Sequence, residues 1–332
     1  MTQATPELPH AGAPATTASG AAHPTAGGAG PPTAASAAPA PAAGGSPSTL
    51  KVGEQSYAVL QADPNDPESP TLYMEMEALQ LTVNFLRHGE PVVFLGEAGS
   101  GKTELARAIS RRMKTDEFFQ CEFGGVISGD QLDGHWALIN GETVHFPSEH
   151  LKAVRAAAEG RRVFYLPDEM NRASMFGINK LLRLYGQWEY VTDTDGVLHV
   201  DPYNLLTIGT MNVGFGFSGT NAVDDAIADR FAPIRLEAPP AELMSRILHD
   251  RFDSHGIDAH TVRGVCKLYE ASRADENSYS LGVRDALKVA KGVCVGKIAL
   301  ISSVEKLIGG AAFLRNLPEE STEALITLAK SL

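Results

Sequence analysis

The residues from Gly96 to Thr103 have the types and the spacing that bind a chain of phosphates. They read GEAGSGKT and directly follow the apolar run PVVFL. Glycines allow successive backbone N–H groups to point at one anion, and the dipole at the start of a helix favours negative charge there. In such a loop Lys102 reaches the β- and γ-phosphates, and the hydroxyl of Thr103 binds Mg²⁺. The predicted nucleotide-binding residues of this loop are Gly96, Glu97, Ala98, Gly99, Ser100, Gly101, Lys102 and Thr103.

An acidic pair, Asp168-Glu169, ends a second apolar run, RVFYLPDE. The carboxyl ends of parallel strands are where α/β sheets bind ligands. There Asp168 is predicted to hold Mg²⁺ through water, and Glu169 to polarise the attacking water. The alternative is an ordinary acidic loop start, which the upstream phosphate loop disfavours. Because proline removes a ladder donor and is rare inside central strands, Pro167 is expected to mark the end of this strand.

Short apolar runs alternate with helical stretches around these motifs. Helices are predicted at residues 73–86, 103–113 and 173–185. Strands are predicted at residues 91–95, 118–123, 162–169, 204–212 and 231–238. A β-hairpin is predicted at residues 188–200, with Asp195-Gly196 at its turn. The alternation predicts an α/β fold with a mostly parallel five-stranded sheet and right-handed crossovers.

The two ends of the chain differ from this central part. Residues 1–48 are almost entirely Ala, Gly, Pro, Thr and Ser. Such a composition buries too little apolar surface to offset the entropy of ordering, so a disordered tail is expected. After Pro239-Pro240 the segments look helical, with no convincing strand. A second, all-helical region is therefore predicted at residues 239–332.

Composition narrows the class of protein. The 332 residues are 43% hydrophobic and 20% charged, with a formal net charge of −12. That balance disfavours a broad surface for nucleic acid, because such affinity comes mainly from phosphate contacts. The three cysteines are widely spaced, which argues against a disulfide framework or a zinc site. With neither a secretory signal nor a membrane-length apolar run in this sequence, the cytoplasm is the expected compartment.

Four motifs together resemble the AAA+ ATPases. They are GEAGSGKT, LPDEMNRAS, TIGTMNVGFGFSGT and DAIADRF, and their order and spacing are those of the family. The Asp-Glu-x-Asn-Arg-Ala signature resembles the MoxR-like branch, which includes gas-vesicle, nitric-oxide-reductase and rubisco activation ATPases and the cobalt chelatase ATPase subunit. The resemblance covers roughly residues 73–295. It implies a P-loop NTPase core at residues 49–238, a small helical lid at 239–332, and ATP with Mg²⁺ as cofactors.

The resemblance also implies roles for three further residues. Asn212, at the end of NLLTIGTMN, looks like the sensor-1 residue that orients water near the γ-phosphate. Arg230, in DAIADRF, resembles the arginine finger donated to the ATP of a neighbouring subunit, where a cation stabilises transition-state charge. Arg284 resembles the sensor-2 arginine of the lid, although a plain surface role remains its rival.

One connection is too long for a plain link between strand and helix. Residues 124–160 separate the second and third predicted strands, whereas such loops usually run about 2–6 residues. In the MoxR-like branch an insert, often a small hairpin that contacts the client, lies here. Trp136 and the phenylalanines of the Gly-Phe-Gly-Phe stretch at 214–217 are therefore candidate client or pore contacts. Packing in the core is the alternative for these aromatic residues.

Two functions follow from the resemblance. The favoured one is an ATP-hydrolysing ring, a hexamer by the same resemblance, that remodels, activates or assembles a protein client. In this branch a von Willebrand A-type protein is often a partner. The alternative is a nucleic-acid-associated ATPase, such as a loader or a restriction-type translocase, because one fold supports both. The acidic balance disfavours the alternative, and salt-dependent stimulation of the ATPase by DNA would distinguish the two.

Overall fold

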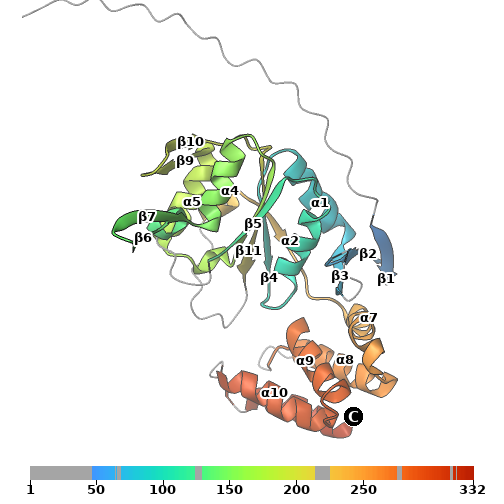
Figure 1. Cartoon of the computed structure of the whole chain (residues 1–332). Coiled ribbons are helices and arrows are strands. Elements are labelled where there is room, and N and C mark those ends of the chain that lie inside the picture. Colours follow the sequence, from blue (N-terminus) through green and yellow to red (C-terminus); the bar gives the residue numbers. More distant parts are fainter. Residues whose placement is uncertain are drawn as a thin grey trace, which may run out of the picture. The chain divides into compact units, whose positions relative to one another are not determined.

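The computed structural model describes residues 47–63, 65, 69–123, 129–213, 225–274, 279–314, 317–318 and 320–332. The expected disordered tail therefore lies outside the described residues, except for its last two. A five-stranded sheet with the order β12–β4–β11–β8–β5 forms the centre of the fold (Figure 1). Every pairing in it is parallel, which confirms the predicted sheet. The strands are β4 (Val92–Gly96), β5 (Glu117–Glu122), β8 (Val163–Asp168), β11 (Leu205–Asn212) and β12 (Ala232–Arg235).

Helices cover both faces of this sheet (Figure 1). On one face Val163 and Tyr165 pack with residues of α4 and α5. On the other face Phe164 and Leu166 pack with residues of α1 and α2. Successive strand residues point to opposite faces, so a strand covered on both sides is apolar almost throughout. The four helices are α1 (Met76–Arg87), α2 (Lys102–Ser110), α4 (Glu149–Ala158) and α5 (Met175–Gln187).

An antiparallel sheet that the sequence analysis did not predict precedes α1. Its strands are β1 (Ser48–Val52), β2 (Gln55–Gln61) and β3 (Thr71–Glu75), in that order. Gly53, with φ +58°, allows the tight β1–β2 connection. Because Thr71–Glu75 pairs with β2, the helix predicted from Tyr73 begins three residues later, at Met76. Long-range pairing therefore overrode the local helical pattern.

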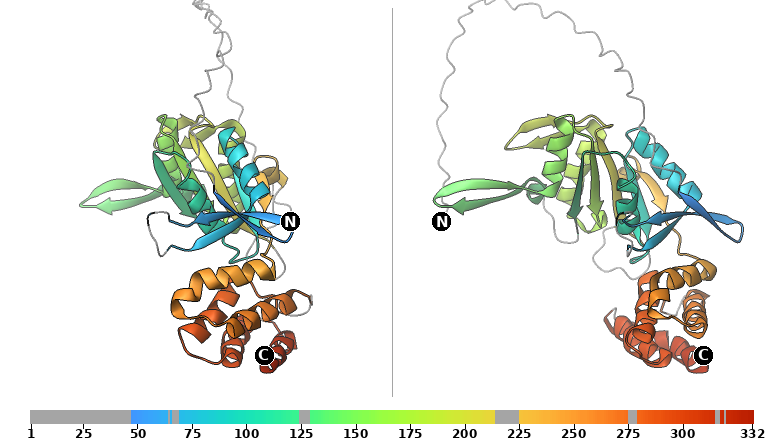
Figure 2. Two further views of the ribbon diagram at one scale, coloured as in Figure 1. Left: turned by 90° about the vertical axis from the view of Figure 1, so that its right-hand side faces the viewer. Right: turned by 45° about the vertical axis from the view of Figure 1, so that its right-hand side comes forward.

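Two hairpins extend the α/β part. The segment between β5 and β8 contains α3 (Gly129–Asp133) and a hairpin of β6 (Gly134–Ile139) and β7 (Glu142–Pro147). Figure 2 shows this hairpin extending away from the sheet. Asn140 and Gly141 both have positive φ, as a tight hairpin turn requires. The predicted second hairpin is confirmed as β9 (Glu189–Thr192) and β10 (Gly196–His199).

The described part of the chain after β12 is helical, as predicted. Methionine, leucine, valine and tyrosine side chains from its helices form one buried cluster of their own. The longer helices are α7 (Ala241–Phe252), α8 (Ala259–Ala274), α9 (Val283–Cys294), α10 (Leu300–Leu314) and α11 (Glu320–Ser331). Three short helical segments complete the described elements, namely η1 (Met170–Arg172), α6 (Asp225–Ala228) and η2 (Asp253–His255). Among the helices that the structure describes, none has the length and apolarity needed to span a membrane.

Pro167 lies inside β8, one residue before its end. It pairs in register with Cys121 of β5, but the register with β11 stops at Tyr165. The proline therefore lies beyond the residues of β8 that pair with β11. Its missing N–H thus costs few hydrogen bonds between strands. On β11, a Cβ at Gly209 would clash with the Met170 sulfur at 2.3 Å, so the bare backbone there makes room for the turn after β8.

Candidate nucleotide site

The phosphate loop joins the end of β4 to the start of α2, as the motif requires. Gly99 and Gly101 have φ of +79° and +90°, in the left-handed region that favours glycine. A Cβ on Gly99 would lie 2.8 Å from the Cβ of Arg284, so only glycine fits at this approach. Since Lys102 and Thr103 begin α2, the free N–H groups and the positive end of its dipole lie beside the loop.

Lys102 is held at the loop by oxygen atoms that surround its ammonium group. Its side chain is buried, with the residue 6% exposed. Nζ donates to the carbonyl oxygens of Gly96 at 3.0 Å and Glu97 at 2.7 Å, and lies 3.4 Å from Ser100 Oγ. Burial lowers the pKa of Lys102 to about 8, although the charges of Asp168 and Glu169 act in the opposite direction. The amine is thus poised to gain charge when an anion arrives.

Nucleotide binding is therefore expected to take up a proton near pH 8. The pKa of Lys102 is about 8 in the free protein, and a triphosphate beside Nζ would raise it. Affinity should be highest below pH 8 and fall as the pH rises through 8, by up to about tenfold per unit. Calorimetry in buffers of different ionisation enthalpy should show about half a proton taken up at pH 8. Lys102→Arg, which cannot titrate there, should show none, and zero uptake by the wild type would contradict the expectation.

Asp168 lies at the carboxyl end of β8, next to the phosphate loop. Its Oδ1 accepts from Thr103 Oγ1 at 2.9 Å and from Thr210 Oγ1 at 2.5 Å. Its Oδ2 accepts from Gln120 Nε2 at 3.3 Å. A carboxylate and a hydroxyl oxygen side by side are ligands that Mg²⁺ accepts, with water and phosphate filling the remaining positions. The two predicted Mg²⁺ residues, Thr103 and Asp168, therefore fit the ion.

Glu169 is held in a sparsely populated backbone conformation, with φ 55°. Its N–H donates to Thr210 Oγ1 at 3.0 Å. Its Oε1 accepts from Asn212 Nδ2 at 3.0 Å, and its Oε2 lies 3.0 Å from Arg172 Nη1. Both oxygens of the predicted water-polarising carboxylate are thus oriented by side chains. The predicted pair Glu169 and Asn212 is brought together by the pairing order β8–β11.

The sequence analysis assigned no role to four residues at this site: Thr210, Arg172, Gln120 and Asn171. Asn171 is buried and donates from Nδ2 to the Asn212 carbonyl at 2.7 Å, which connects η1 to β11. One signal could have found Thr210: it lies two residues before Asn212 on the same strand, and therefore on the same face. Gln120 offered no local signal, because its contact depends on the pairing of β5 with β8.

Arg230 is not brought to this site. Its Nη1 donates to the Ala226 carbonyl at 3.0 Å, and a Cβ on Gly186 would meet its Nε at 2.9 Å. Gly186 lies at the carboxyl end of α5, whose first residue, Met175, follows the acidic turn. At 1.5 Å per residue, α5 separates these two ends by roughly 16 Å. Arg230 therefore packs at the end of α5 that is remote from the acidic turn of its own chain.

Arg284 does lie beside the loop, in the first turn of α9, where it is exposed. It borders a cavity of about 240 Å³ next to Gly99, Ser100 and Gly101. This cavity is also lined by Tyr73 and Glu75 of β3 and by Leu236. A space of this kind next to the phosphate loop can hold the base and sugar of a nucleotide.

Relatives of this chain share the central region. Residues 91–231 match the family described as "AAA domain (dynein-related subfamily)". "Putative chaperone BssE" of Thauera aromatica is 26% identical over 235 residues, covering 68% of this chain and 79% of that protein. "Lon protease homolog, mitochondrial 1" of Dictyostelium discoideum is 24% identical over 68% of this chain. This chain spans only 23% of that Lon homolog's length.

Among solved structures, the RuvB Holliday junction branch migration motor of Thermotoga maritima is similar at 13% identity and a TM-score of 0.42. The alignment covers 74% of this chain and 69% of that one. The family match is narrower than the region over which the motifs resemble AAA+ ATPases, but it contains the phosphate loop, the acidic pair, Asn212 and Arg230. Residues 91–231, which contain the phosphate loop and the parallel strands β4, β5, β8 and β11, are therefore similar to the AAA domain of this family.

Proposed function

We propose that this protein is a MoxR-like AAA+ ATPase that hydrolyses ATP with Mg²⁺ and uses the energy to remodel a protein client in the cytoplasm. The observation that carries the hydrolysis proposal is the oriented carboxylate of Glu169. It lies one residue from Asp168, which contacts Thr103 of the phosphate loop. A base beside the metal and the γ-phosphate is what activation of water requires. In this proposal Mg²⁺ would be held by Thr103 and Asp168, and would neutralise phosphate charge.

The position of Arg230 supports an assembly of identical subunits. Since Arg230 lies at the far end of α5 from its own acidic turn, it would serve the ATP of a neighbouring chain. A head-to-tail contact of this kind closes into a ring when the rotation between subunits allows it. We propose such a ring, a hexamer, with a core at residues 49–238 and a lid at 239–332 that carries Arg284.

An exposed apolar hairpin supports a protein client. Trp136 and Leu138 of β6 are 59% and 74% exposed, and Ile139, Val144 and Phe146 are also exposed. Grouped apolar side chains on a surface mark contact sites for other molecules. The BssE relative is named as a chaperone, which favours the same class of client. The other candidate client contacts, at residues 214–217, lie outside the described residues.

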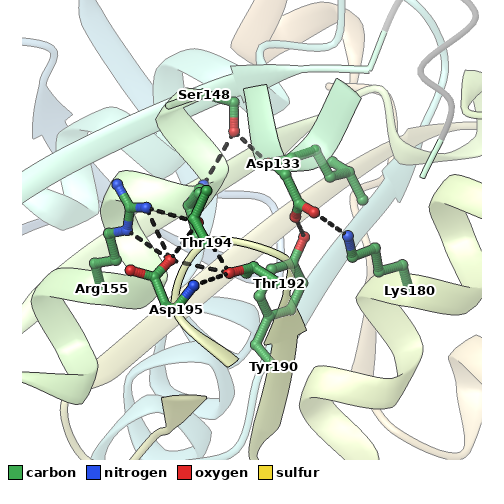
Figure 3. A network of polar contacts seen from close by, with 10 residues as sticks. Asp133, Ser148, Arg155, Lys180, Tyr190, Thr192, Thr194 and Asp195 are labelled. Carbon is green, nitrogen blue, oxygen red and sulfur yellow. Dashed lines mark hydrogen bonds and ion pairs between the residues drawn. The ribbon is translucent and has the colours of Figure 1, made fainter. Parts of the chain in front are cut away.

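The base of the hairpin is tied to the element that follows the acidic turn (Figure 3). Asp133, directly before β6, accepts from the Tyr190 hydroxyl at 2.8 Å and pairs with Lys180 Nζ at 2.5 Å. Lys180 is on α5, which begins shortly after Glu169 and Arg172. Arg155 of α4 holds Asp195 of the second hairpin through Nε at 3.0 Å and Nη2 at 2.8 Å. A shift of α5 during turnover would therefore move the hairpin with it.

The test is phosphate release by the purified full chain with ATP and Mg²⁺. We expect release that stops when Mg²⁺ is chelated, and that an unfolded protein probe, reduced lactalbumin, stimulates. Trp136→Ser and Leu138→Ser should reduce this stimulation, because they remove apolar contact area. Val197→Ser, at a half-exposed valine of the other hairpin, is the matched control. If duplex DNA alone stimulated phosphate release, and less so as the salt concentration rises, the client would be nucleic acid and not protein.

A further inference from the structure

An ion pair links the phosphate loop to a helix 176 residues away in the chain. Arg273, next to the last residue of α8, lies with Nη2 2.7 Å from Glu97 Oε2. Its Nη1 is 3.4 Å from Glu97 Oε1, so the guanidinium spans both carboxylate oxygens. Two-point pairing fixes orientation as well as distance. Glu97 follows Gly96 and is the first residue of the loop proper.

The arginine is itself held in place by a buried tyrosine. The Arg273 guanidinium carbon lies 4.9 Å from the centre of the Tyr269 ring, one helical turn earlier. Tyr269 is 2% exposed, and its hydroxyl donates to the Pro239 carbonyl at 3.0 Å. The Arg273 side chain is only 26% exposed. A guanidinium stacked on a fixed ring loses little further freedom when it binds a carboxylate.

Glu97 also contacts Lys102, through its main chain. The Glu97 carbonyl oxygen accepts from Lys102 Nζ at 2.7 Å, shorter than the contact of that amine with Gly96. The peptide that Arg273 orients through the Glu97 side chain therefore carries an acceptor of the lysine that would bind phosphate. Without Arg273, the Glu97 carboxylate would also stand uncompensated beside the incoming triphosphate, where like charges repel.

We propose that Arg273 is a positioning residue for nucleotide binding, which acts through Glu97 by orienting the loop and neutralising the carboxylate. It would set the affinity for the triphosphate rather than the chemical step. The inference rests on the proposed function only in that the loop binds nucleotide, and it does not require hydrolysis. Arg284, by contrast, touches the loop at Gly99 and is predicted to contact the nucleotide itself.

The test is a double-mutant cycle read by binding of a fluorescent ATP analogue to the full chain. Arg273→Ala should weaken Kd about fivefold in the wild-type background, a size typical of a partly exposed but well-oriented pair. In the Glu97→Gln background the same change should alter Kd by less than about twofold, because no carboxylate remains to be held. Arg273→Lys keeps the charge but not the two-point contact, so its Kd should lie between those of the wild type and Arg273→Ala. Turnover by Arg273→Ala at saturating ATP should stay near that of the wild type.

Arg263→Ala is the matched control, since Arg263 is exposed on the same helix. It should leave Kd unchanged, and thermal midpoints of all variants report whether folding is affected. Equal weakening by Arg273→Ala in both backgrounds would overturn the proposal, because Arg273 would then act on the nucleotide directly. An unchanged Kd in the wild-type background would overturn it as well. If the wild type released no phosphate, the proposed hydrolysis would be wrong, but the binding test of Arg273 would still be valid.

Discussion

Glu169→Gln is expected to bind ATP with near wild-type affinity and to turn it over at least about a hundredfold more slowly, the lower range for loss of a general base. Glutamine has nearly the same volume and keeps an oxygen to accept from Asn212 Nδ2, so among these contacts only the ion pair with Arg172 is lost. It cannot accept a proton from water, which is the step proposed for Glu169. Phosphate release and Kd, measured on one preparation, separate the two effects.

The control for this variant is another carboxylate at the same edge of the sheet. Glu122 ends β5 and pairs in register with Asp168, yet its side chain is exposed. Glu122→Gln removes a negative charge close to the site without touching the oriented carboxylate. It should retain most of the turnover. Normal hydrolysis by Glu169→Gln would mean that another group activates the water, and the catalytic assignment would fail.

Arg230→Ala is expected to lose turnover by about a thousandfold, the lower range for removal of an arginine finger, with ATP still bound. The reason is the position of Arg230, which packs at the Gly186 end of α5, away from the acidic turn of its own chain. Arg183→Ala is the surface control on α5, the helix against which Arg230 packs, because Arg183 is exposed and contacts only Gln187 among the hydrogen bonds of the described residues.

Mixing two inactive variants tests whether Arg230 acts in a neighbouring subunit. A site with its own Glu169 intact, in an Arg230→Ala chain, can receive Arg230 from an adjacent Glu169→Gln chain. In an equal random mixture, about a quarter of head-to-tail interfaces would combine both intact residues. Turnover should therefore return when the two variants are mixed and allowed to exchange subunits. No recovery, with exchange demonstrated by labelled chains, would contradict action in trans.

Much of the fold was predictable because its signals are local. The apolar runs that became β4, β8 and β11 are bounded by turn residues and alternate with helical segments, so the parallel sheet followed. The β1–β3 sheet was missed because β3 shares its residues with a helical pattern that continues into α1. Only pairing with β2 reveals those residues as a strand. The residue pattern of a single segment does not show which other strand it pairs with.

The residues of the candidate site also fall into two groups: those that a local sequence signal predicted, and those that only folding brings together. The sequence by itself determined the phosphate loop, the acidic pair and their place at strand ends, because glycines, lysine and carboxylates at short spacing specify their chemistry locally. The tertiary structure alone decided which side chains orient Glu169, that Arg230 packs at the Gly186 end of α5, and that Arg273 reaches Glu97. These contacts join residues 43 to 176 positions apart or depend on the packing of whole helices, and only the folded chain brings them together.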